Sequence, residues 1–285
     1  MRRSHRLLPI VVLLAACSGK PAHDTTSATE VHALRRAAIA TDPADAAWQD
    51  APEYRAVLQL QDMVEPRLLA PSTPEVRVRA LTDGTKLAVR LDWPDASPND
   101  VPGPAKFSDA CALQIPAKPS PDQPAPQMGE PGRPVEITYW RASWQATVDG
   151  RPDDIRALYP AAAPDGYPFD AASLAKGSPE QVAMAKRYAP ARALGNDLAG
   201  PRTQPVQDLV GEGPGTLHPA AQARSEGRGV RTPAGWSVVL VRPLAGSGGG
   251  TPDVIAFAVW SGEHGEVGAR KMRTGWVPLR VTEAP

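Results

Sequence analysis

Cysteine and histidine are scarce in this sequence. It contains two cysteines, and one of them, Cys17, lies at the end of an apolar N-terminal segment, which leaves Cys111 for the folded part. One thiol cannot form an intramolecular disulfide, so a hydrophobic core must hold the domain together. The lack of a CxxCH motif excludes covalent c-type haem attachment, and cysteine-based zinc or iron–sulphur sites are excluded as well. His264 lies in a glycine-rich turn without a partner at metal-ligand spacing, so a metal or base role for it is a minor alternative.

An excess of charge of one sign is also lacking. The chain has 31 basic and 31 acidic residues, with a pI of about 7.0. General nucleic-acid binding depends on clustered lysines and arginines, so no nucleic-acid partner is expected. There is neither a GxSxG motif nor a P-loop, which argues against the common hydrolase classes. The 33 prolines and 24 glycines, against 3 phenylalanines, indicate many turns and irregular connections.

The N-terminus has the pattern of a lipoprotein signal peptide, predicted to cover residues 1–16. Arg2, Arg3 and Arg6 precede "LLPIVVLLAA", an apolar run that is too short to span a bilayer with ease. The segment ends in "LAAC", which resembles a bacterial lipoprotein cleavage site. We therefore expect Cys17 to be lipidated and to become the mature N-terminus.

The predicted lipid is the only membrane attachment that we expect. Residues 17–41 are predicted as a lipidated tether, polar at first and weakly helical later, and residues 42–285 as the folded domain. Ser18, in place of Asp, favours sorting to the outer membrane over the inner one. The domain is expected to face the periplasm.

Hydrophobic alternation predicts a mainly β fold. In "VRVRALTDGTKLAVRLDW", Val76, Val78 and Ala80 alternate with arginines before an Asp83-Gly84 turn, which is typical of a hairpin. Further strands are predicted in "ACALQIP", "VEITYWRASWQATV", "GWSVVLVRPL", "DVIAFAVW" and "GWVPLRV". This pattern indicates an antiparallel β-sandwich.

The β pattern is interrupted between residues 151 and 230. That region is rich in proline and glycine, and "SPEQVAMAKRY" is predicted as a helix with Ser178 as its N-cap and Pro190 at its end. We expect a loop-rich insert with short helices here, and long insertions of this kind are usually functional. In the strand before it, the alternation places Val135, Ile137 and Tyr139 on one side.

Several motifs follow one another along the chain. They are "FSDACALQIP", "MGEPGRPVEITYWRASWQ", "YAPARALGN", "VQDLVGEGPGTL", "GWSVVLVRPL" and "IAFAVWSGEHGEVGARKMRTGW". Together they resemble the haem-b-binding gamma subunit family of ethylbenzene dehydrogenase, which includes the corresponding subunits of dimethylsulphide dehydrogenase, selenate reductase and chlorate reductase. The resemblance covers about residues 42 to 283, and the shared order makes it more specific than any single motif.

The resemblance implies a β-sandwich with one non-covalent haem b per chain, whose iron has a methionine and a lysine as axial ligands. Carried over to this sequence, these ligands are Met128 of the "MG" motif and Lys271 between the glycine-rich turn and Trp276. A thioether is a soft, neutral ligand, and an amine binds iron only when deprotonated, so the pKa of the lysine must fall from about 10.4. Two protein ligands leave no open position on the iron, which implies electron transfer without catalysis.

The same resemblance implies partners. These are a molybdopterin catalytic subunit, an iron–sulphur subunit, and a soluble cytochrome or the quinone pool. The lipoprotein signal departs from a soluble gamma subunit, and so does the proline-rich loop "PAKPSPDQPAPQ" just before Met128, which leaves the placement of that ligand open.

Other residues compete for these roles. Met63 and Met184 are alternative sulphur ligands, whereas Met272 is disfavoured because its neighbour Lys271 points the other way in an extended chain. Surface arginines are commoner than cofactor ligands, but the arginines on either side of Lys271 could pair with haem propionates. They are Arg270 and Arg273.

A rival function needs no cofactor. Trp140, Trp144, Trp236, Trp260 and Trp276 are most simply core residues and pocket walls, but tryptophans can also stack on sugar rings. The alternative is therefore a carbohydrate- or surface-binding β-sandwich lipoprotein, and a purely structural envelope lipoprotein is a third reading.

Overall fold

The computed structural model describes residues 29–152, 155–161, 178–188, 191, 194, 196, 202–244 and 250–283. The strands are β1 Val31–Arg35, β2 Tyr54–Val57, β3 Gln59–Leu60, β4 Glu75–Thr82, β5 Lys86–Pro94, β6 Ala110–Pro116, β7 Val135–Arg141, β8 Val206–Gly211, β9 His218–Pro219, β10 Glu226–Thr232, β11 Gly235–Pro243, β12 Val254–Trp260, β13 Met272–Arg273 and β14 Val277–Thr282. The helices are η1 Ala46–Trp48, α1 Ala142–Val148, α2 Ile155–Leu158 and α3 Pro179–Tyr188. The predicted mainly β class is confirmed. The predicted signal peptide and Cys17 lie outside the described residues.

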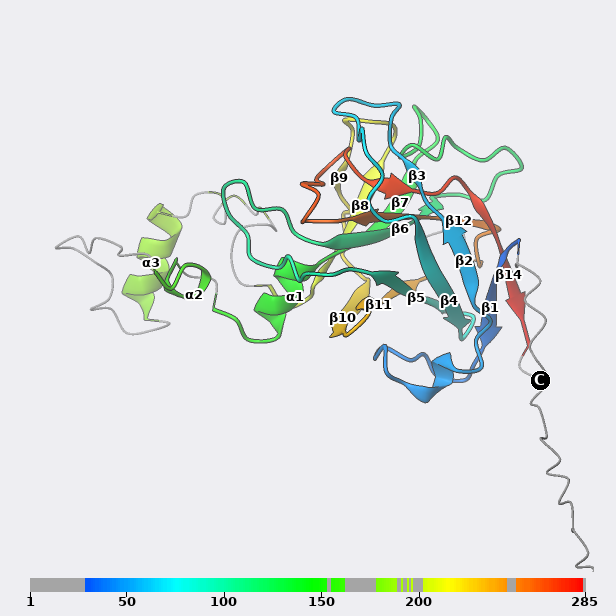
Figure 1. The fold of residues 1–285 in the computed structure, drawn as a ribbon, viewed down its shortest axis with the longest axis horizontal. Helices are drawn as coiled ribbons and strands as arrows, with labels where there is room; N and C mark the ends of the chain where they lie inside the picture. Colours follow the sequence, from blue (N-terminus) through cyan, green and yellow to red (C-terminus); the bar gives the residue numbers. More distant parts are fainter. Residues whose placement is uncertain are drawn as a thin grey trace, which may run out of the picture.

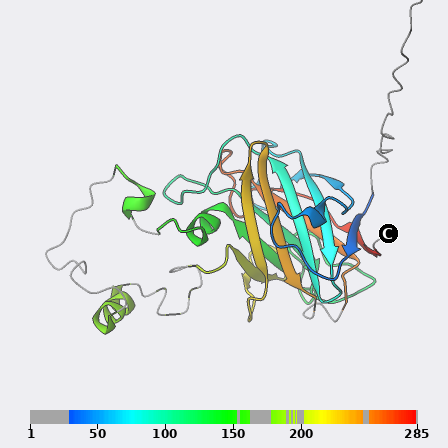
Figure 2. The same ribbon diagram turned by 90° about the horizontal axis from the view of Figure 1, so that it is seen from below.

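The strands form one hydrogen-bonded sheet that doubles over into two layers (Figures 1 and 2). The first layer runs β10-β11-β5-β4-β1-β14, with β2 on β4, and the second runs β12-β6-β7-β8-β9, with β13 on β12 and β3 on β13. The layers meet where β14 pairs with β12. The pairings of β1 with β14 and β4 are parallel and the others are antiparallel, so the sheet is mixed.

The main core lies between the two layers. Val78 and Val89 of the predicted hairpin are fully buried from one side, and Leu113 of β6 and Phe257 of β12 pack from the other. The hairpin turn has Gly84 at φ 88°, a left-handed conformation that glycine adopts without strain. Period-2 alternation therefore predicted the buried face of this hairpin.

The outer face of each layer carries a smaller apolar cluster. On the first layer, Trp48 of η1 covers Leu81 and Val239. On the second layer, β7 contributes Val135, Ile137 and Tyr139 to one cluster, so the prediction that they share a side is confirmed. The second cluster is the floor of the cavity described below.

The N-terminal segment differs from its prediction. Residues Val31–Arg35 were expected within a weakly helical tether, but they form β1, which lies in the first layer between β4 and β14. Val31 and Ala33 are buried in the main core. The helical expectation is wrong here because long-range pairing on both edges decides the conformation of a short segment with no strong local preference.

The predicted insert also contains strands that were not expected. Strands β8 and β9 lie within residues 151–230, where no strand was expected, and β10 begins there. β9 and β10 are edge strands with many exposed or partly exposed residues, so their hydrophobic pattern is weak. Conversely, the long strand expected from residue 135 ends at Arg141, and α1 follows. Ser178 caps α3 as predicted, since its Oγ accepts from the Gln181 N–H at 3.1 Å, whereas Pro190 lies outside the described residues.

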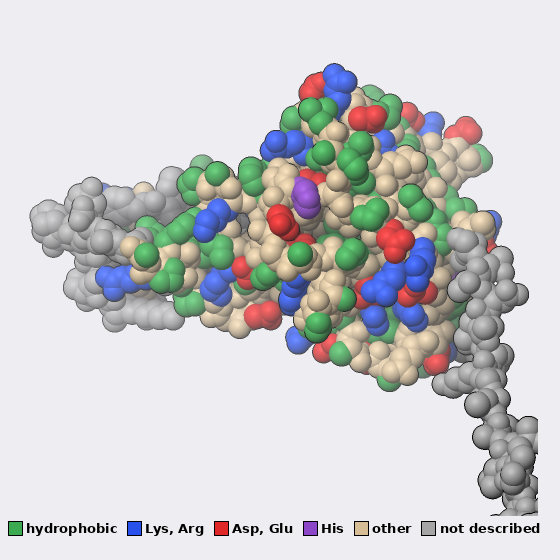
Figure 3. Space-filling model, viewed as in Figure 1, with side chains coloured by type: hydrophobic (Ala, Val, Ile, Leu, Met, Phe, Trp, Pro, Cys, Tyr) green, Lys and Arg blue, Asp and Glu red, His purple; other side chains and the backbone are tan. Residues whose placement is uncertain are grey.

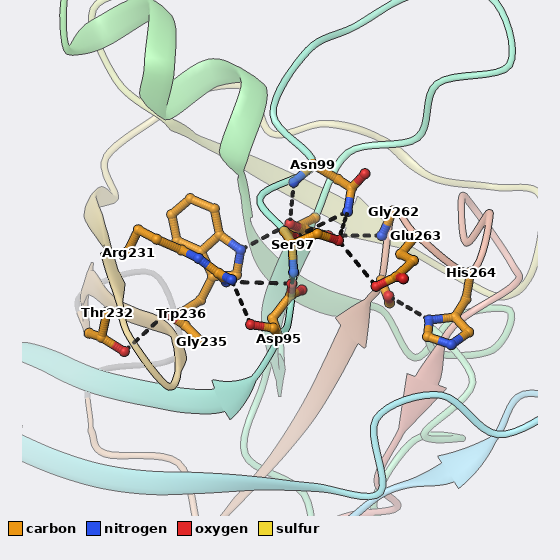
Figure 4. A network of polar contacts seen from close by, with 12 residues as sticks. Asp95, Ser97, Asn99, Arg231, Thr232, Gly235, Trp236, Gly262, Glu263 and His264 are labelled. Atoms are coloured by element: carbon orange, nitrogen blue, oxygen red, sulfur yellow. Dashed lines mark hydrogen bonds and ion pairs between the residues drawn. The ribbon is translucent and has the colours of Figure 1, made fainter.

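Asn99, Trp236 and Gly262, which Figure 4 labels, all donate to one buried carboxylate. Asp109 is fully buried, and it accepts hydrogen bonds from the Asn99 N–H, the Gly262 N–H and Trp236 Nε1 at 2.8–2.9 Å. Burial raises the pKa of Asp109, so these three donors stabilise an otherwise costly charge. The network fixes the turn after β12, which leads to Lys271.

The surface shows no dominant charge. Acidic and basic side chains are interspersed over the face in Figure 3, in agreement with the zero net charge. Among the described residues, no helix has the length and apolarity needed to cross a membrane.

Candidate functional site

A cavity of about 410 Å³ lies over the outer face of the second layer. This volume is within the range of about 300–1,000 Å³ that is usual for small-molecule and cofactor sites. Its floor consists of side chains that alternate along β6, β7, β8 and β12. They are Ala112, Gln114, Ile137, Tyr139, Leu209, Ala256, Ala258 and Trp260.

Small residues create the space. Ala112 and Ala258 are paired directly across β6 and β12, and Ala256 lies two residues away on the same face. The intervening residues, such as Phe257, point into the main core. In the run "VIAFAVW", Ile255, Phe257 and Val259 thus point inward, while the small Ala256 and Ala258 point outward, followed by Trp260 at the end of the floor. The sequence pattern predicted a near-continuous apolar strand here, placed beside the haem by the family resemblance, but it did not indicate which side chains form the floor.

Loops from distant parts of the chain form the walls. One wall follows β3, a second precedes β7, a third connects β8 to β9 and a fourth connects β12 to β13. Their lining residues are Gln61, Val64, Glu65, Pro126, Gln127, Met128, Pro214, Gly215, Leu217, Gly268, Ala269, Lys271, Arg273 and Thr274. Both predicted iron ligands therefore line the same cavity.

Met128 is held in an unusual backbone conformation. Its φ is 68°, which is uncommon for a residue other than glycine and often marks a functional site. The Gly213 N–H donates to its carbonyl at 2.8 Å. Gln114 Nε2 and Trp276 Nε1 bind the carbonyls of Pro126 (3.1 Å) and Pro124 (2.7 Å), so the end of the proline-rich loop is anchored beside the ligand.

Lys271 contacts Met128 in the wall of the cavity. Its Nζ lies 3.8 Å from Met128 Sδ and 5.1 Å from the centre of the Trp260 ring. Gln61 fixes the backbone around it, because its N–H donates to the Lys271 carbonyl at 3.1 Å and its Nε2 to the Ala269 carbonyl at 3.0 Å. The structure thus brings together two residues that are 143 positions apart in the sequence.

The environment of Lys271 disfavours its charge. The side chain is 9% exposed, and no carboxylate of the described residues lies within ion-pair distance. Burial, with a smaller contribution from repulsion by Arg273, lowers the pKa of Lys271 to about 8. About one tenth of the amine is then neutral at pH 7, against well under a thousandth for an unperturbed lysine, and the neutral form is the one that can bind a metal.

The competing methionines are placed elsewhere. Met272 is 2% exposed and packs in the main core, on the opposite side of the chain from Lys271, as expected. Met63 is 68% exposed near the cavity mouth, and Met184 lies on α3. Neither of these two lines the cavity. Met128 is the methionine that the fold pairs with the lysine.

The site does not resemble a site for a hard metal ion. The described residues contain no group of three His, Cys, Asp or Glu side chains that could hold an ion. His264 instead contacts Ser261 Oγ through Nδ1 at 2.8 Å, within the turn after β12. A neutral thioether and an amine in an apolar cavity are a donor set that suits haem iron and does not suit Ca²⁺ or Mg²⁺.

The tryptophans form core and walls. Trp140 and Trp236 pack in the main core, Trp260 lines the cavity, and Trp144 and Trp276 are half-buried. No tryptophan or tyrosine is among the exposed large apolar side chains of the described residues. An exposed aromatic platform, which a sugar-binding surface would use, is therefore missing from this part of the chain.

Comparison with known proteins identifies the family of the chain. The family model described as ethylbenzene dehydrogenase matches residues 45–272, and the chain belongs to that family, as the ordered motifs predicted. A protein named respiratory nitrate reductase heme subunit, from Haloferax mediterranei, is 24% identical over 82% of this chain and 66% of its own length. Chlorate reductase subunit gamma of Ideonella dechloratans is 24% identical over 95% of this chain and 94% of its own length.

Proposed function

We propose that this chain is a lipid-anchored haem b electron-transfer protein, the gamma-type subunit or partner of a periplasmic molybdopterin oxidoreductase. One haem b would be held non-covalently in the cavity, with Met128 and Lys271 as its axial ligands. The observation that carries the proposal is the pairing of a thioether and a desolvated amine, 3.8 Å apart, at an apolar cavity. The names of the two relatives, a heme subunit and a gamma subunit of reductases, support it.

The residues fit the group in shape and in chemistry. Ala112, Ala256 and Ala258 leave room over the sheet for a flat apolar ring, and Gln61 and the strained backbone at Met128 fix the two donors. These donors touch one another in the structure, so they would separate to admit iron between them. When bound, the haem supplies a one-electron redox centre.

The proposed role is electron transfer and not catalysis. Two protein donors would occupy both axial positions, so no position remains for a substrate. The apolar surroundings lower the pKa of the amine to about 8, so its deprotonation for binding to iron would have only a modest cost at neutral pH. The partners would be a molybdopterin catalytic subunit and an iron–sulphur subunit, with a soluble cytochrome or the quinone pool at the other end of the electron path.

The visible spectrum tests the proposal. Full-length protein from a haem-producing host is recorded oxidised and then dithionite-reduced, for wild type, Met128→Ala and Lys271→Ala. We expect a low-spin b-type spectrum in the wild type, and high-spin or haem-free protein in both variants, because each variant removes one axial donor. Met184→Ala on α3 and the exposed Lys106→Ala are matched controls, and they should keep the wild-type spectrum.

Two results would contradict the proposal. A wild type without haem, despite an adequate haem supply, would exclude the haem function and make sugar-binding assays the next step. Variants that both retain the low-spin spectrum would show that Met128 and Lys271 are not the ligands.

A further inference from the structure

Arg273 is a buried cation without a carboxylate partner among the described residues. Its side chain lines the cavity two residues after Lys271 and is 8% exposed. Its Nη1 lies 3.4 Å from the Thr274 carbonyl and its Nη2 3.7 Å from Met63 Sδ, both long contacts. Its Nε is buried and has no hydrogen-bond partner. A guanidinium in this state has lost its hydration without gaining a counter-charge, which is costly.

Other arginines in the structure show how unusual this is. Arg242, which is as buried as Arg273, and five partly buried arginines each face a carboxylate. The pairs are Arg36 with Asp50, Arg79 with Glu53, Arg90 with Asp92, Arg151 with Asp100, Arg231 with Asp95 and Arg242 with Glu136. At the cavity, the one acidic lining residue of the described chain is Glu65, which is exposed and pairs with Arg67 at 2.6 Å. The cavity therefore holds an excess of positive charge.

We infer that Arg273 binds a carboxylate of the cavity's ligand. Under the proposed function, on which this inference rests, the carboxylate is a haem propionate. A guanidinium presents parallel N–H donors that match a carboxylate in a bidentate geometry, and such charge-assisted bonds are among the strongest in proteins. The orphan Nε supplies one donor, and the Nη2 contact with a methionine sulphur is weak enough to be exchanged for an oxygen.

The position of Arg273 also defines an orientation. Met63, which touches its guanidinium, is 68% exposed, so this end of the cavity opens to solvent. The floor at Ala112 and Ala258 is apolar. A ring with two carboxylates on one edge would place that edge at Arg273 and its apolar edges over the floor. Arg270 differs, because it does not line the cavity and lies over Phe107 instead.

Haem and haem dimethyl ester, which lacks the carboxylates, test the inference. Haem-free full-length protein is loaded with each compound, and the dissociation rate is measured by transfer to a haem-scavenging apoprotein. We expect wild type to release the ester about ten- to a hundredfold faster than haem, in line with the strength of charged hydrogen bonds. Arg273→Gln should release both compounds at nearly equal, fast rates. Arg270→Gln should discriminate as the wild type does.

The outcomes separate this inference from the proposed function. If wild type binds neither compound, the haem function fails. If wild type binds both and releases them equally, or if Arg273→Gln discriminates as wild type does, haem binding stands and the role of Arg273 is overturned. Arg273→Lys keeps the charge but lacks the parallel N–H donors of a guanidinium, so it should discriminate between haem and the ester to an intermediate degree. This variant serves as the test if Arg273→Gln does not fold.

Discussion

Burial of Lys271 has opposite consequences for metal binding and for the stability of the fold. A buried amine suits a metal, but in the protein without a ligand it carries a charge that burial penalises. Its pKa is about 8 in the folded chain, against 10.5 when unperturbed. The buried charge of Lys271 therefore lowers the free energy of unfolding of the protein without a ligand. Such a loss of stability is common at functional positions. Removing the charge should have opposite effects on folding and on cofactor binding.

We predict that Lys271→Met stabilises the haem-free protein at pH 7 by up to about 3 kcal/mol, since each pKa unit corresponds to about 1.4 kcal/mol. Below pH 8 the amine is charged in both states and the native state bears the full penalty. Between pH 8 and 10.5 the native state loses its proton first, so wild-type stability rises with pH and the gain of the variant shrinks.

Urea unfolding at pH 7 and pH 10 measures this difference. The exposed Lys106→Met is the control and should show no gain at either pH. A Lys271→Met variant that is less stable than wild type at pH 7 would mean that the lysine is a structural residue, which the fold needs for its own stability.

At the level of strands, the cavity depends on small side chains on β12. Ala258 is 9% exposed and faces the cavity, while its neighbours Phe257 and Val259 fill the main core. We predict that Ala258→Leu reduces haem affinity at least about tenfold, because the new methyl groups occupy the space of the ring. The fold should persist, since the cavity and not the core receives the added volume.

Haem titration and thermal unfolding, measured on the same samples, check this. Ala96→Leu, at an exposed loop position, is the matched control and should leave both quantities unchanged. An Ala258→Leu variant that binds haem like wild type would place the ligand away from β12.

The elements that the sequence predicted are those with their own strong pattern. β4, β5, β6, β11 and β12 alternate or are apolar throughout, so they could be located directly. β1 could not, because its conformation depends on parallel partners more than 40 residues away. α1 was merged with β7, since "RASWQATV" reads equally well as strand or helix. In the site, family motifs gave Met128 and Lys271, but the alanine floor and the unpaired state of Arg273 depend on strand register and loop packing.

For the whole molecule, the position of β1 changes the expected attachment to the membrane. The first described strand begins at Val31, so the segment that would join a lipid on Cys17 to this strand is residues 18–30. Fully extended, that segment spans at most about 45 Å, against about 80 Å for residues 18–41. A lipidated chain would then hold its haem close to the bilayer, within reach of membrane-bound partners and less suited to long-range shuttling.

We predict that Cys17→Ser releases the protein from the membrane fraction without altering its haem spectrum. The lining residues of the cavity all lie between Gln61 and Thr274, so anchoring and cofactor binding use separate parts of the chain. Membrane and soluble fractions of the producing cells are compared, and the mass of the mature N-terminus is measured. A wild type found in the soluble fraction with an unmodified N-terminus would refute the lipid anchor while leaving the haem site untouched. A soluble Cys17→Ser protein that has lost its haem would instead show that the anchor and the site depend on each other.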